Sequence, residues 1–574
     1  MRRTRGHLAG ARRLAWPFGR IRASRLLFAP HDLRTADPTV AADIYAGYFA
    51  LAGRTVNGHG ESPFAIVPPS EAWAEALHGF GWLRHLRAAD TAIARANARA
   101  LVDEFLGQRH DREPVARRPR IMARRLMSFL SHSPLLLEGA DHLFYGRFIR
   151  HVTQTAERLQ LALAGAVEGL DRLQGLVALT FAAICLEGQD RRLRRIEAAL
   201  ADELERQIQP DGGHLSRNPG VIIDLLLDLL PLRETFSARG LEPPRGIIMA
   251  IDRMMPHLRL FRHGDGALAL FNGMGPTPPD LMATLAAYDD ARARPIEHAA
   301  YAGYDRLSAG PTTVVIDAGK PPSGAASIEA HAGCLSFELS SGSSRIVVNC
   351  GASRHGAPAQ RLAARTTAAH STVVIDDRSS CVFGLVLGER RITAGPSDVR
   401  VARQDGPDGI DWMASHDGYR RAFGVAHTRR LRLRSGGAEL VGEDEIAAQP
   451  AGGPPAAPLP AAARFHLHPA VKASLIREGE GALLALPSGE VWAFEAAGHR
   501  VALEESVFFA ATDGRRRSSQ LVVSFDAAAT PTLSWRFARL GAAGRRAAAL
   551  AEETPAPAAN PPEDLPPADP APSP

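Results

Sequence analysis

Lysine is almost absent from this chain of 574 residues, since Lys320 and Lys472 are the only two. Arginine carries the positive charge instead, and beside the abundant alanine this uniform replacement indicates a coding bias rather than a binding strategy. The formal net charge is only +5. So small an excess over this length does not indicate nucleic acid as a partner.

Cysteines are also few, and none belongs to a CxxC pair; they are Cys185, Cys334, Cys350 and Cys381. Four cysteines in so long a chain exclude a disulfide framework, and we expect buried free thiols. No apolar run reaches the ~20 residues that a membrane-spanning helix requires. The longest, residues 173–186, contains Gln174 and is predicted to be a buried helix, so we expect no transmembrane segment.

The two ends of the chain have unusual compositions. Residues 1–35 contain nine arginines and a single acid, Asp32, and these arginines interrupt the apolar stretch that a signal peptide needs. We interpret this basic N-terminal segment as a solvated tail or as a segment loosely attracted to an anionic partner. Residues 541–574 are rich in alanine and proline, and we expect that tail to be disordered.

Between these ends the sequence changes character near residue 305. From about residue 70 to residue 260, leucine and alanine recur three and four residues apart, as in 147–170 and 191–208. This spacing predicts amphipathic helices that pack on one another. A bundle, a solenoid and an (α/α) toroid all fit the pattern. Residues 36–305 are therefore predicted to form one helical domain.

Short strands and hairpin turns follow the helices. Three pairs of predicted strands flank turns that contain glycine: 335–339 with 345–348, 431–434 with 439–441, and 483–486 with 491–494. Repeated hairpins without intervening helices indicate an antiparallel β-sandwich over residues 306–540. The alternation of His427 with Arg429, and of His466 with His468, predicts polar sheet faces or, alternatively, metal-chelating pairs.

The most informative segment is Glu329-Ala330-His331-Ala332-Gly333, which is followed by Asn349-Cys350-Gly351 and by a second histidine, His370. This order resembles the C-terminal domain of the heparinase II/III-like polysaccharide lyases, whose pattern is HxHxDxxSF, then Asp-x-Gly, then an AHNT-like element. The resemblance covers about residues 60–540. It implies an (α/α) toroid followed by an antiparallel β-sandwich, with an acidic polysaccharide bound in the cleft between them.

The resemblance also implies β-elimination on a uronate-containing, glycosaminoglycan-like glycan. That reaction requires the uronate charge to be quenched, a base to remove the adjacent proton, and an acid to protonate the leaving oxygen. His214, Arg217 and Asn218 match the toroid segment that meets the substrate carboxylate. The alternative is an interhelical turn in which Asn218 caps a helix that begins at Pro219.

In the sandwich, the resemblance makes Glu329, His331 and His370 the candidates for proton transfer. His331 and His370 also match a metal-associated histidine pair, with Asn349 where the metal-binding members have an aspartate. The resemblance thus implies a structural zinc, although a neutral amide is a poor zinc ligand.

Three positions depart from the family's pattern. The first histidine of HxHxD is Glu329, its aspartate is Gly333, and no tyrosine lies between Tyr145 and Tyr288, where a toroid tyrosine is expected. Two hypotheses follow: a polysaccharide lyase, or a catalytically weak or inactive glycan-binding protein of the cell envelope on the same scaffold. The family works mainly in the periplasm or cell envelope, whereas the lack of a legible signal peptide favours the cytoplasm.

Overall fold

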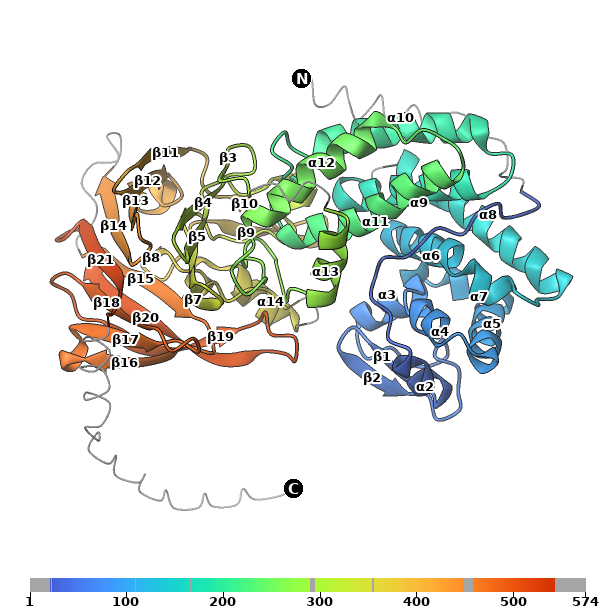
Figure 1. Cartoon of the computed structure of the whole chain (residues 1–574), viewed down its shortest axis with the longest axis horizontal. Coiled ribbons are helices and arrows are strands. Elements are labelled where there is room, and N and C mark those ends of the chain that lie inside the picture. The colour runs from blue at the N-terminus through green and yellow to red at the C-terminus, as the bar shows by residue number, and fades with distance from the viewer. Residues whose placement is uncertain are drawn as a thin grey trace, which may run out of the picture.

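The computed structural model describes residues 21, 23–108, 110–165, 167–289, 295–353, 356–448 and 458–541. The predicted C-terminal tail and most of the basic N-terminal segment lie outside these residues. Helices form the first half of the chain and antiparallel strands the second, and the two parts lie side by side along the long axis (Figure 1). The predicted fold class, a helical domain followed by a β-sandwich, is confirmed.

The helical domain contains a small hairpin, β1 (Tyr48–Leu51) with β2 (Arg54–Asn57), and a succession of helices of different lengths. These helices are α2 (Thr39–Tyr45), α3 (Glu71–Gly79), α4 (Leu83–Ala89), α5 (Ala92–Gly107), α6 (Pro119–Ser131), α7 (Ser133–Leu137), α8 (His142–Ala164), α9 (Gly169–Cys185), α10 (Asp190–Gln207), α11 (Pro219–Ala238), α12 (Arg245–Leu260) and α13 (Pro279–Ala287). No helix in the described part of the chain is both long enough and apolar enough to cross a membrane.

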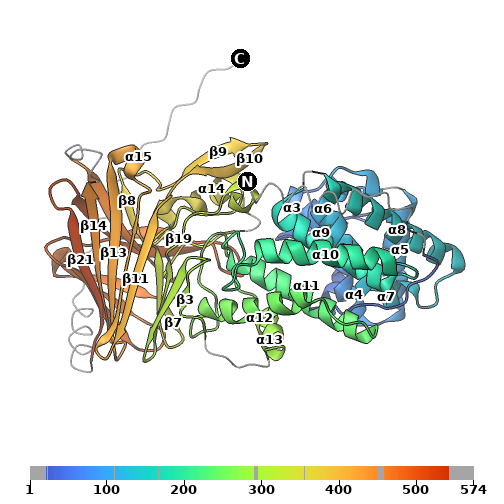
Figure 2. The same cartoon turned by 90° about the horizontal axis from the view of Figure 1, so that it is seen from above.

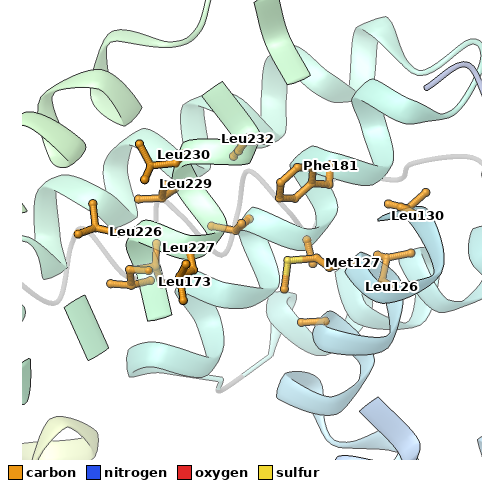
Figure 3. Close-up of a cluster of buried hydrophobic side chains, with 14 of the residues drawn as sticks. Leu126, Met127, Leu130, Leu173, Phe181, Leu226, Leu227, Leu229, Leu230 and Leu232 are labelled. Atoms are coloured by element: carbon orange, nitrogen blue, oxygen red, sulfur yellow. The ribbon is translucent and has the colours of Figure 1, made fainter. Parts of the chain in front are cut away.

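The core of this domain is built from leucine-rich helix faces. Side chains of α6, α9 and α11 meet there, among them Leu126, Phe181 and Leu229 (Figure 3). Helix α11 is apolar on nearly all sides, because neighbouring helices cover it on more than one face. The predicted helix at 173–186 is confirmed as the buried α9, which contains Cys185. All four cysteines are buried and free, as predicted.

The described end of the N-terminal segment packs along these helices. The amide of Leu27 donates to the carbonyl of Cys185 at 2.7 Å. Arg34 forms an ion pair of 2.9 Å with Asp228 of α11, whose side chain is only 3% exposed. For these residues the interpretation as a solvated tail is wrong, because Arg34 compensates a buried carboxylate of the helical core.

Two antiparallel sheets and one small hairpin make up the second half. The nine-stranded sheet has the order β19 (Ala502–Phe508), β20 (Arg516–Asp526), β15 (Pro460–Leu467), β7 (Ser344–Val348), β6 (Phe337–Ser341), β5 (Thr312–Asp317), β4 (Tyr304–Ala309) and β3 (His298–Ala299), with β8 (Val373–Ile375) pairing with β15. The eight-stranded sheet has the order β11 (Val399–Gly406), β12 (Gly409–His416), β13 (Val425–Arg434), β14 (Glu439–Ala448), β21 (Thr532–Arg539), β18 (Val491–Ala496), β17 (Gly481–Ala485) and β16 (Lys472–Ile476).

The strand predictions are confirmed at all three hairpins, which correspond to β6–β7, β13–β14 and β17–β18. A separate hairpin, β9 (Val382–Val386) with β10 (Glu389–Ala394), and the helix α14 (Pro358–Arg365) lie at the end of the sandwich nearest to the helices (Figure 2). A short helix, α15 (Arg420–Phe423), precedes β13.

His427, Arg429 and His466, which the sequence assigned to polar sheet faces or metal-chelating pairs, lie buried inside the sandwich. Arg429 is fully buried and donates to both carboxylate oxygens of Asp444, at 2.7 and 2.9 Å. The same carboxylate accepts hydrogen bonds from His427 and from Trp535. His466 is buried as well, with Nε2 on the carbonyl of Ala368 and Nδ1 on Ser506. The polar positions thus form internal networks inside the sandwich.

Gly442 of β14 lets Trp535 reach this network. A Cβ atom at this position would lie 2.1 Å from the indole ring, so we expect Gly442→Ala to displace Trp535 and to destabilise the protein by about 1–3 kcal/mol. Gly436, in the turn between β13 and β14, has no atom within 4 Å of a built Cβ and serves as the control. Thermal unfolding should show a lower Tm for Gly442→Ala alone. Equal Tm values for the two variants would contradict this account of the core.

Candidate functional site

The segment that carries Glu329 and His331 is a loop between a short 3-10 helix, Gly324–Ser327, and β6. Arg365, at the end of α14, holds this loop in place: its Nε donates to the carbonyl of Ala330 at 2.8 Å and its Nη2 to that of Ser327 at 2.9 Å. The loop is therefore a fixed part of the junction between the helical domain and the sandwich, although it has no regular secondary structure.

The structure brings His331 and His370 together, with His331 Nδ1 at 3.0 Å from His370 Nε2. His370 Nδ1 lies 2.7 Å from the carbonyl of Thr366, which can only accept, so that nitrogen carries the proton. Burial lowers the pKa of His370 to about 4 and that of His331 well below its ordinary value. Both rings are thus neutral at pH 7. His370 Nε2 accepts from His331 Nδ1, and the bare nitrogen of the pair is His331 Nε2.

Gly333 explains one departure from the family's pattern. A Cβ at this position would lie 2.7 Å from the ring of His370, so the imidazole occupies the space that the expected aspartate would need. Asn349 lies close by, fully buried, and its Oδ1 accepts from the amide of Ser371 at 2.9 Å. Its Nδ2 finds no partner among the described residues.

These residues do not make a good zinc site. Within the described ranges, no group of three or more His, Cys, Asp or Glu side chains is placed to hold a metal ion. The two imidazoles face each other without an anionic ligand, and the amide oxygen of Asn349 is already used. Zinc prefers thiolate, imidazole and carboxylate ligands, so the zinc assignment stays a prediction that this donor set does not favour.

The second predicted segment is a turn between α10 and α11. The Asp211 carboxylate fixes it to the sandwich by accepting from the amides of Tyr301 and Ala302, each at 2.8 Å. His214 is 2% exposed, and both of its ring nitrogens are occupied: Nε2 bonds Gln207 and Nδ1 accepts from the amide of Ser216. Burial lowers the pKa of His214 to about 4, so the ring is neutral and has no free donor.

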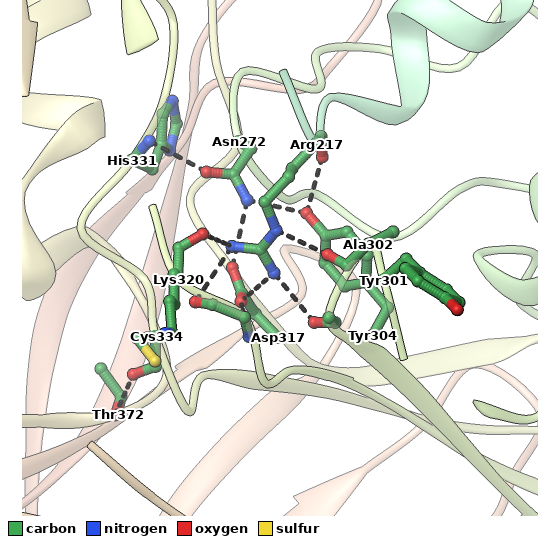
Figure 4. Close-up of polar contacts among 12 residues, drawn as sticks. Arg217, Asn272, Tyr301, Ala302, Tyr304, Asp317, Lys320, His331, Cys334 and Thr372 are labelled. Carbon is green, nitrogen blue, oxygen red and sulfur yellow. Dashed lines mark hydrogen bonds and ion pairs between the residues drawn. The ribbon is translucent and has the colours of Figure 1, made fainter. Parts of the chain in front are cut away.

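Arg217 is directed into the domain junction. Nε donates to the carbonyl of Ala302, and Nη1 donates to those of Gly319 and Lys320. Nη2 donates to the carbonyl of Gly303 at 2.8 Å and to Asp317 Oδ1 at 2.6 Å (Figure 4). These contacts account for all five N–H donors of a guanidinium. Although burial disfavours its charged form, the Asp317 carboxylate raises the pKa of Arg217.

Two glycines leave room for the side chain of Arg217. Cβ atoms built on Gly303 and Gly319 would meet neighbouring atoms at 2.4 Å, and at Gly319 the atom met is Nη2 of Arg217 itself. The ring of Tyr304 lies 4.6 Å below the guanidinium, and its hydroxyl donates to the Arg217 carbonyl. Arg217 has φ +59°, a conformation that is unfavourable for arginine and that these contacts impose.

Asn218 and Glu329 meet at the same junction, where Asn218 is buried and Glu329 is exposed. Asn218 is the N-cap of α11: its Oδ1 accepts from the amide of Gly220 at 2.8 Å, and Pro219 follows as the first helical residue. The predicted cap is confirmed. The Asn218 side-chain amide points to Glu329 Oε2 at 3.4 Å, and Glu329 is exposed. Gly273 makes this approach possible, because a Cβ there would lie 3.0 Å from Asn218 Nδ2.

The predicted site residues thus fall into three neighbouring groups: the buried Asn218 with the exposed Glu329, the buried pair His331 and His370, and the inward-facing His214 and Arg217. Asn272 links them. Its side-chain oxygen accepts from the amide of His331 at 3.1 Å, and its nitrogen donates to Tyr304 and to Asp317. Asn272 was not among the residues predicted for the site. Asp317 and Arg365 were missed, because nothing in their sequence neighbourhoods marks them as partners of residues about 100 and 35 positions away.

This fold and junction define a protein of the toroid-plus-sandwich class that polysaccharide lyases use. The chain belongs to the heparinase II/III-like family. Residues 291–536 match the model of the heparinase II/III-like C-terminal domain. FtsZ-localized protein C of Caulobacter vibrioides (strain NA1000 / CB15N) is 32% identical over 487 residues, which are 81% of this chain and 81% of that protein.

Solved structures agree on the fold. Heparinase III superposes with a TM-score of 0.66 at 12% identity, over 83% of this chain and 79% of that chain. A mutant of the heparan sulfate lyase HepC from Pedobacter heparinus superposes with a TM-score of 0.61 at 14% identity, over 93% of this chain and 87% of that chain. At such low identity these likenesses establish the architecture, a helical toroid followed by a sandwich, and leave the chemistry to be argued from the residues.

The Arg217 contacts predict a structural effect of mutation. Arg217→Met leaves the carboxylate of Asp317 buried without its cation, and we expect a loss of about 3–5 kcal/mol in the free energy of unfolding. Arg432→Met, which removes a half-exposed partner of Asp411, should cost less than about 1 kcal/mol. Denaturant unfolding measures both. An Arg217→Met protein as stable as the wild type would contradict the structural role and would favour a role in ligand binding.

The neutral histidines predict a dependence of stability on pH. His214 and His370 titrate near pH 4 in the folded protein and near 6.5 when unfolded, so the unfolded chain binds more protons between these values. Their contribution is complete above pH 6.5 and is lost as the pH falls to about 4, on the order of 3 kcal/mol each. The Tm should fall over this range, and His214→Gln should flatten the decline. His142→Gln, which changes an exposed histidine of α8, should leave the slope unchanged.

Proposed function

We propose that this chain is a glycan-binding member of the heparinase II/III-like family that holds its ligand at the junction of toroid and sandwich without cleaving it. The observation that carries this proposal is the state of Arg217. All five of its donors are engaged by four carbonyls and by Asp317, so none remains to quench a uronate charge. Without that quenching, the carbanion of a β-elimination is not stabilised.

The other residues of the predicted mechanism support the same conclusion. His214 has both ring nitrogens bonded inside the helical domain. The hydroxyl of Tyr304 donates to the carbonyl of Arg217, and burial raises the pKa of this phenol far above its ordinary value. Tyr301 is exposed, but none of its recorded contacts is with Glu329, His331 or His370. Neither His214 nor Tyr304 is therefore free to act as a base.

The names and folds of the related proteins are compatible with glycan binding without cleavage. FtsZ-localized protein C bears a name that describes a location and not a reaction. The heparinase III and heparan sulfate lyase structures have the same architecture as this chain. A protein that has this fold, but whose charged residues make internal contacts, is suited to binding a glycan without cleaving it.

A lyase remains the second candidate, and one observation favours it. Glu329 is an exposed carboxylate at the position of a family catalytic histidine, next to the Asn218 amide. In that reading Asn218 would hold the substrate acid, and Glu329, His331 and His370 would arrange the proton transfers. Glu329 would have to approach an anionic sugar with its own charge, which electrostatic repulsion opposes.

One experiment separates the two candidates. The purified full chain is incubated with a panel of acidic and neutral polysaccharides, while the ultraviolet absorbance of unsaturated sugar ends and the binding are both recorded. We expect binding without a rise in absorbance. A rise that is lost in Glu329→Gln and His370→Ala would establish the lyase instead. Absence of both signals across the panel would remove the glycan-binding proposal.

A further inference from the structure

The hairpin β9–β10 carries the densest group of exposed aliphatic side chains in the described part of the chain. In β9 and the turn that follows it, Leu387 is 91% exposed, Leu385 71%, Val382 53% and Val386 36%. Because successive side chains of a strand point to opposite faces, these residues are exposed on both faces of the hairpin. A cluster of exposed aliphatic side chains marks a surface that another molecule covers.

The hairpin is attached to the rest of the protein mainly through β10. This strand lies against the 3-10 helix Gly324–Ser327, which in turn contacts α9. Arg365 Nη1 donates to the carbonyl of Arg390 in β10 at 3.0 Å, and its guanidinium stacks over the ring of Phe383. In the described part of the chain, the main-chain hydrogen bonds of β9 all go to β10. The other edge of β9 therefore has alternate amides and carbonyls that no described residue bonds.

The two strands differ in the features that normally prevent a sheet edge from pairing with another chain. β10 contains Glu389, Arg390 and Arg391, and its register shifts between Ile392 and Ala394. Charged side chains and bulges of this kind oppose the addition of a further strand. Residues 379–388, which include β9, contain no charged side chain and no proline. The hairpin is thus open to strand addition at β9 and protected against it at β10.

We propose that β9 is a dimerisation surface, which pairs antiparallel with β9 of a second copy of this chain and forms a four-stranded sheet with it. When this pairing is centred on Gly384, every residue of the strand has an opposite residue. Val382 then faces Val386 of the second copy, and Phe383 faces its Leu385. Cross-strand pairs of β-branched, aromatic and aliphatic side chains stabilise antiparallel sheets. The contact uses the same surface on both copies, as a two-fold dimer requires.

The distribution of charge favours an identical strand as the partner. Like charges directly opposite each other destabilise a strand pair, and β9 has no charge to place there. Arg390 lies on β10, so its two copies would be three strand spacings apart, about 14 Å, which is beyond the Debye length of about 8 Å at physiological salt. Figure 2 shows the hairpin at the upper edge of the molecule, above α14, where a second chain can approach.

The test is the mass of the full chain in solution, measured by analytical ultracentrifugation over a series of protein concentrations. We expect a reversible equilibrium of monomer and dimer. The Kd should be on the order of 10–100 µM, because a seam between two short strands is smaller than the roughly 800 Å² per partner of a stable interface. A chain that stays monomeric up to about 200 µM overturns the proposal, because that concentration exceeds the expected Kd.

Leu385→Lys introduces a charge into the seam and removes an aliphatic contact, so the Kd should rise about tenfold or more. Leu161→Lys is the matched control, because Leu161 of α8 is 74% exposed and lies in a different part of the chain. It should leave the Kd unchanged. Neither leucine is buried, so both variants should keep the Tm of the wild type. A dimer that both variants form with the same Kd overturns the proposal.

Hydrogen–deuterium exchange of the unmodified chain locates the contact independently of any substitution. Amides of residues 382–386 should exchange more slowly in concentrated than in dilute protein, because half of the edge amides gain a partner in the dimer. Amides of α8 should exchange equally at both concentrations. Concentration-dependent protection that appears elsewhere and not in β9 overturns the proposal, since the two copies would then meet at another surface.

Discussion

The contact of Arg217 with Asp317 and the surrounding carbonyls is the constraint on which the junction depends. It joins the residue before the α11 cap to the end of β5, two points about 100 residues apart in sequence. A buried ion pair gives stability only when its geometry is close to ideal and its remaining hydrogen-bonding groups are satisfied. Here both conditions hold, because Asn272 and the amide of Gly319 complete the Asp317 carboxylate. A Cβ at Gly303 or Gly319 would collide with atoms around the guanidinium, which explains why both positions are glycine.

Other polar contacts repeat this arrangement along the same boundary. His263, which follows α12, bonds Glu338 and Ser340 of β6, and Glu338 also accepts from the amides of Leu270 and Asn349. Apolar side chains of the sandwich continue into the helical core beside these contacts, among them Val315, Val348 and Phe508. Toroid and sandwich therefore share a packed and hydrogen-bonded boundary. Such a boundary specifies one relative placement of the two parts, because any other placement would leave these buried donors and acceptors unpaired.

The sequence was sufficient for the architecture and for the local structure of the site, but not for the direction of its side chains. Periodicity predicted helices and then hairpins, and Asn218-Pro219 predicted the start of α11. The helix expected through residues 147–170 instead breaks after Ala164, where Gly165 and Gly169 interrupt it. His214 and Arg217 were expected to meet a substrate carboxylate, yet both precede α11 and make internal contacts, and Arg217 has a left-handed backbone conformation. Only tertiary contacts with residues 207, 302–303 and 317–320 determine where these two side chains point.

The residues at positions 329 and 333, which depart from the family's pattern, have a combined effect on the two histidines and on the charge of the loop. With glycine at position 333, the ring of His370 moves into the space of the missing carboxylate and pairs with His331. Burial keeps both imidazoles neutral, and the pairing leaves one bare nitrogen, which is an acceptor. With glutamate at position 329, the exposed carboxylate of the same loop is an acceptor as well. A β-elimination site needs donors that stabilise a developing negative charge, and a site made of acceptors raises the energy of that charge instead. The contacts of Arg217, Asp317 and Asn272 that hold the junction do not involve residues 329 and 333. A scaffold whose junction is held by other residues can keep its shape when positions 329 and 333 change.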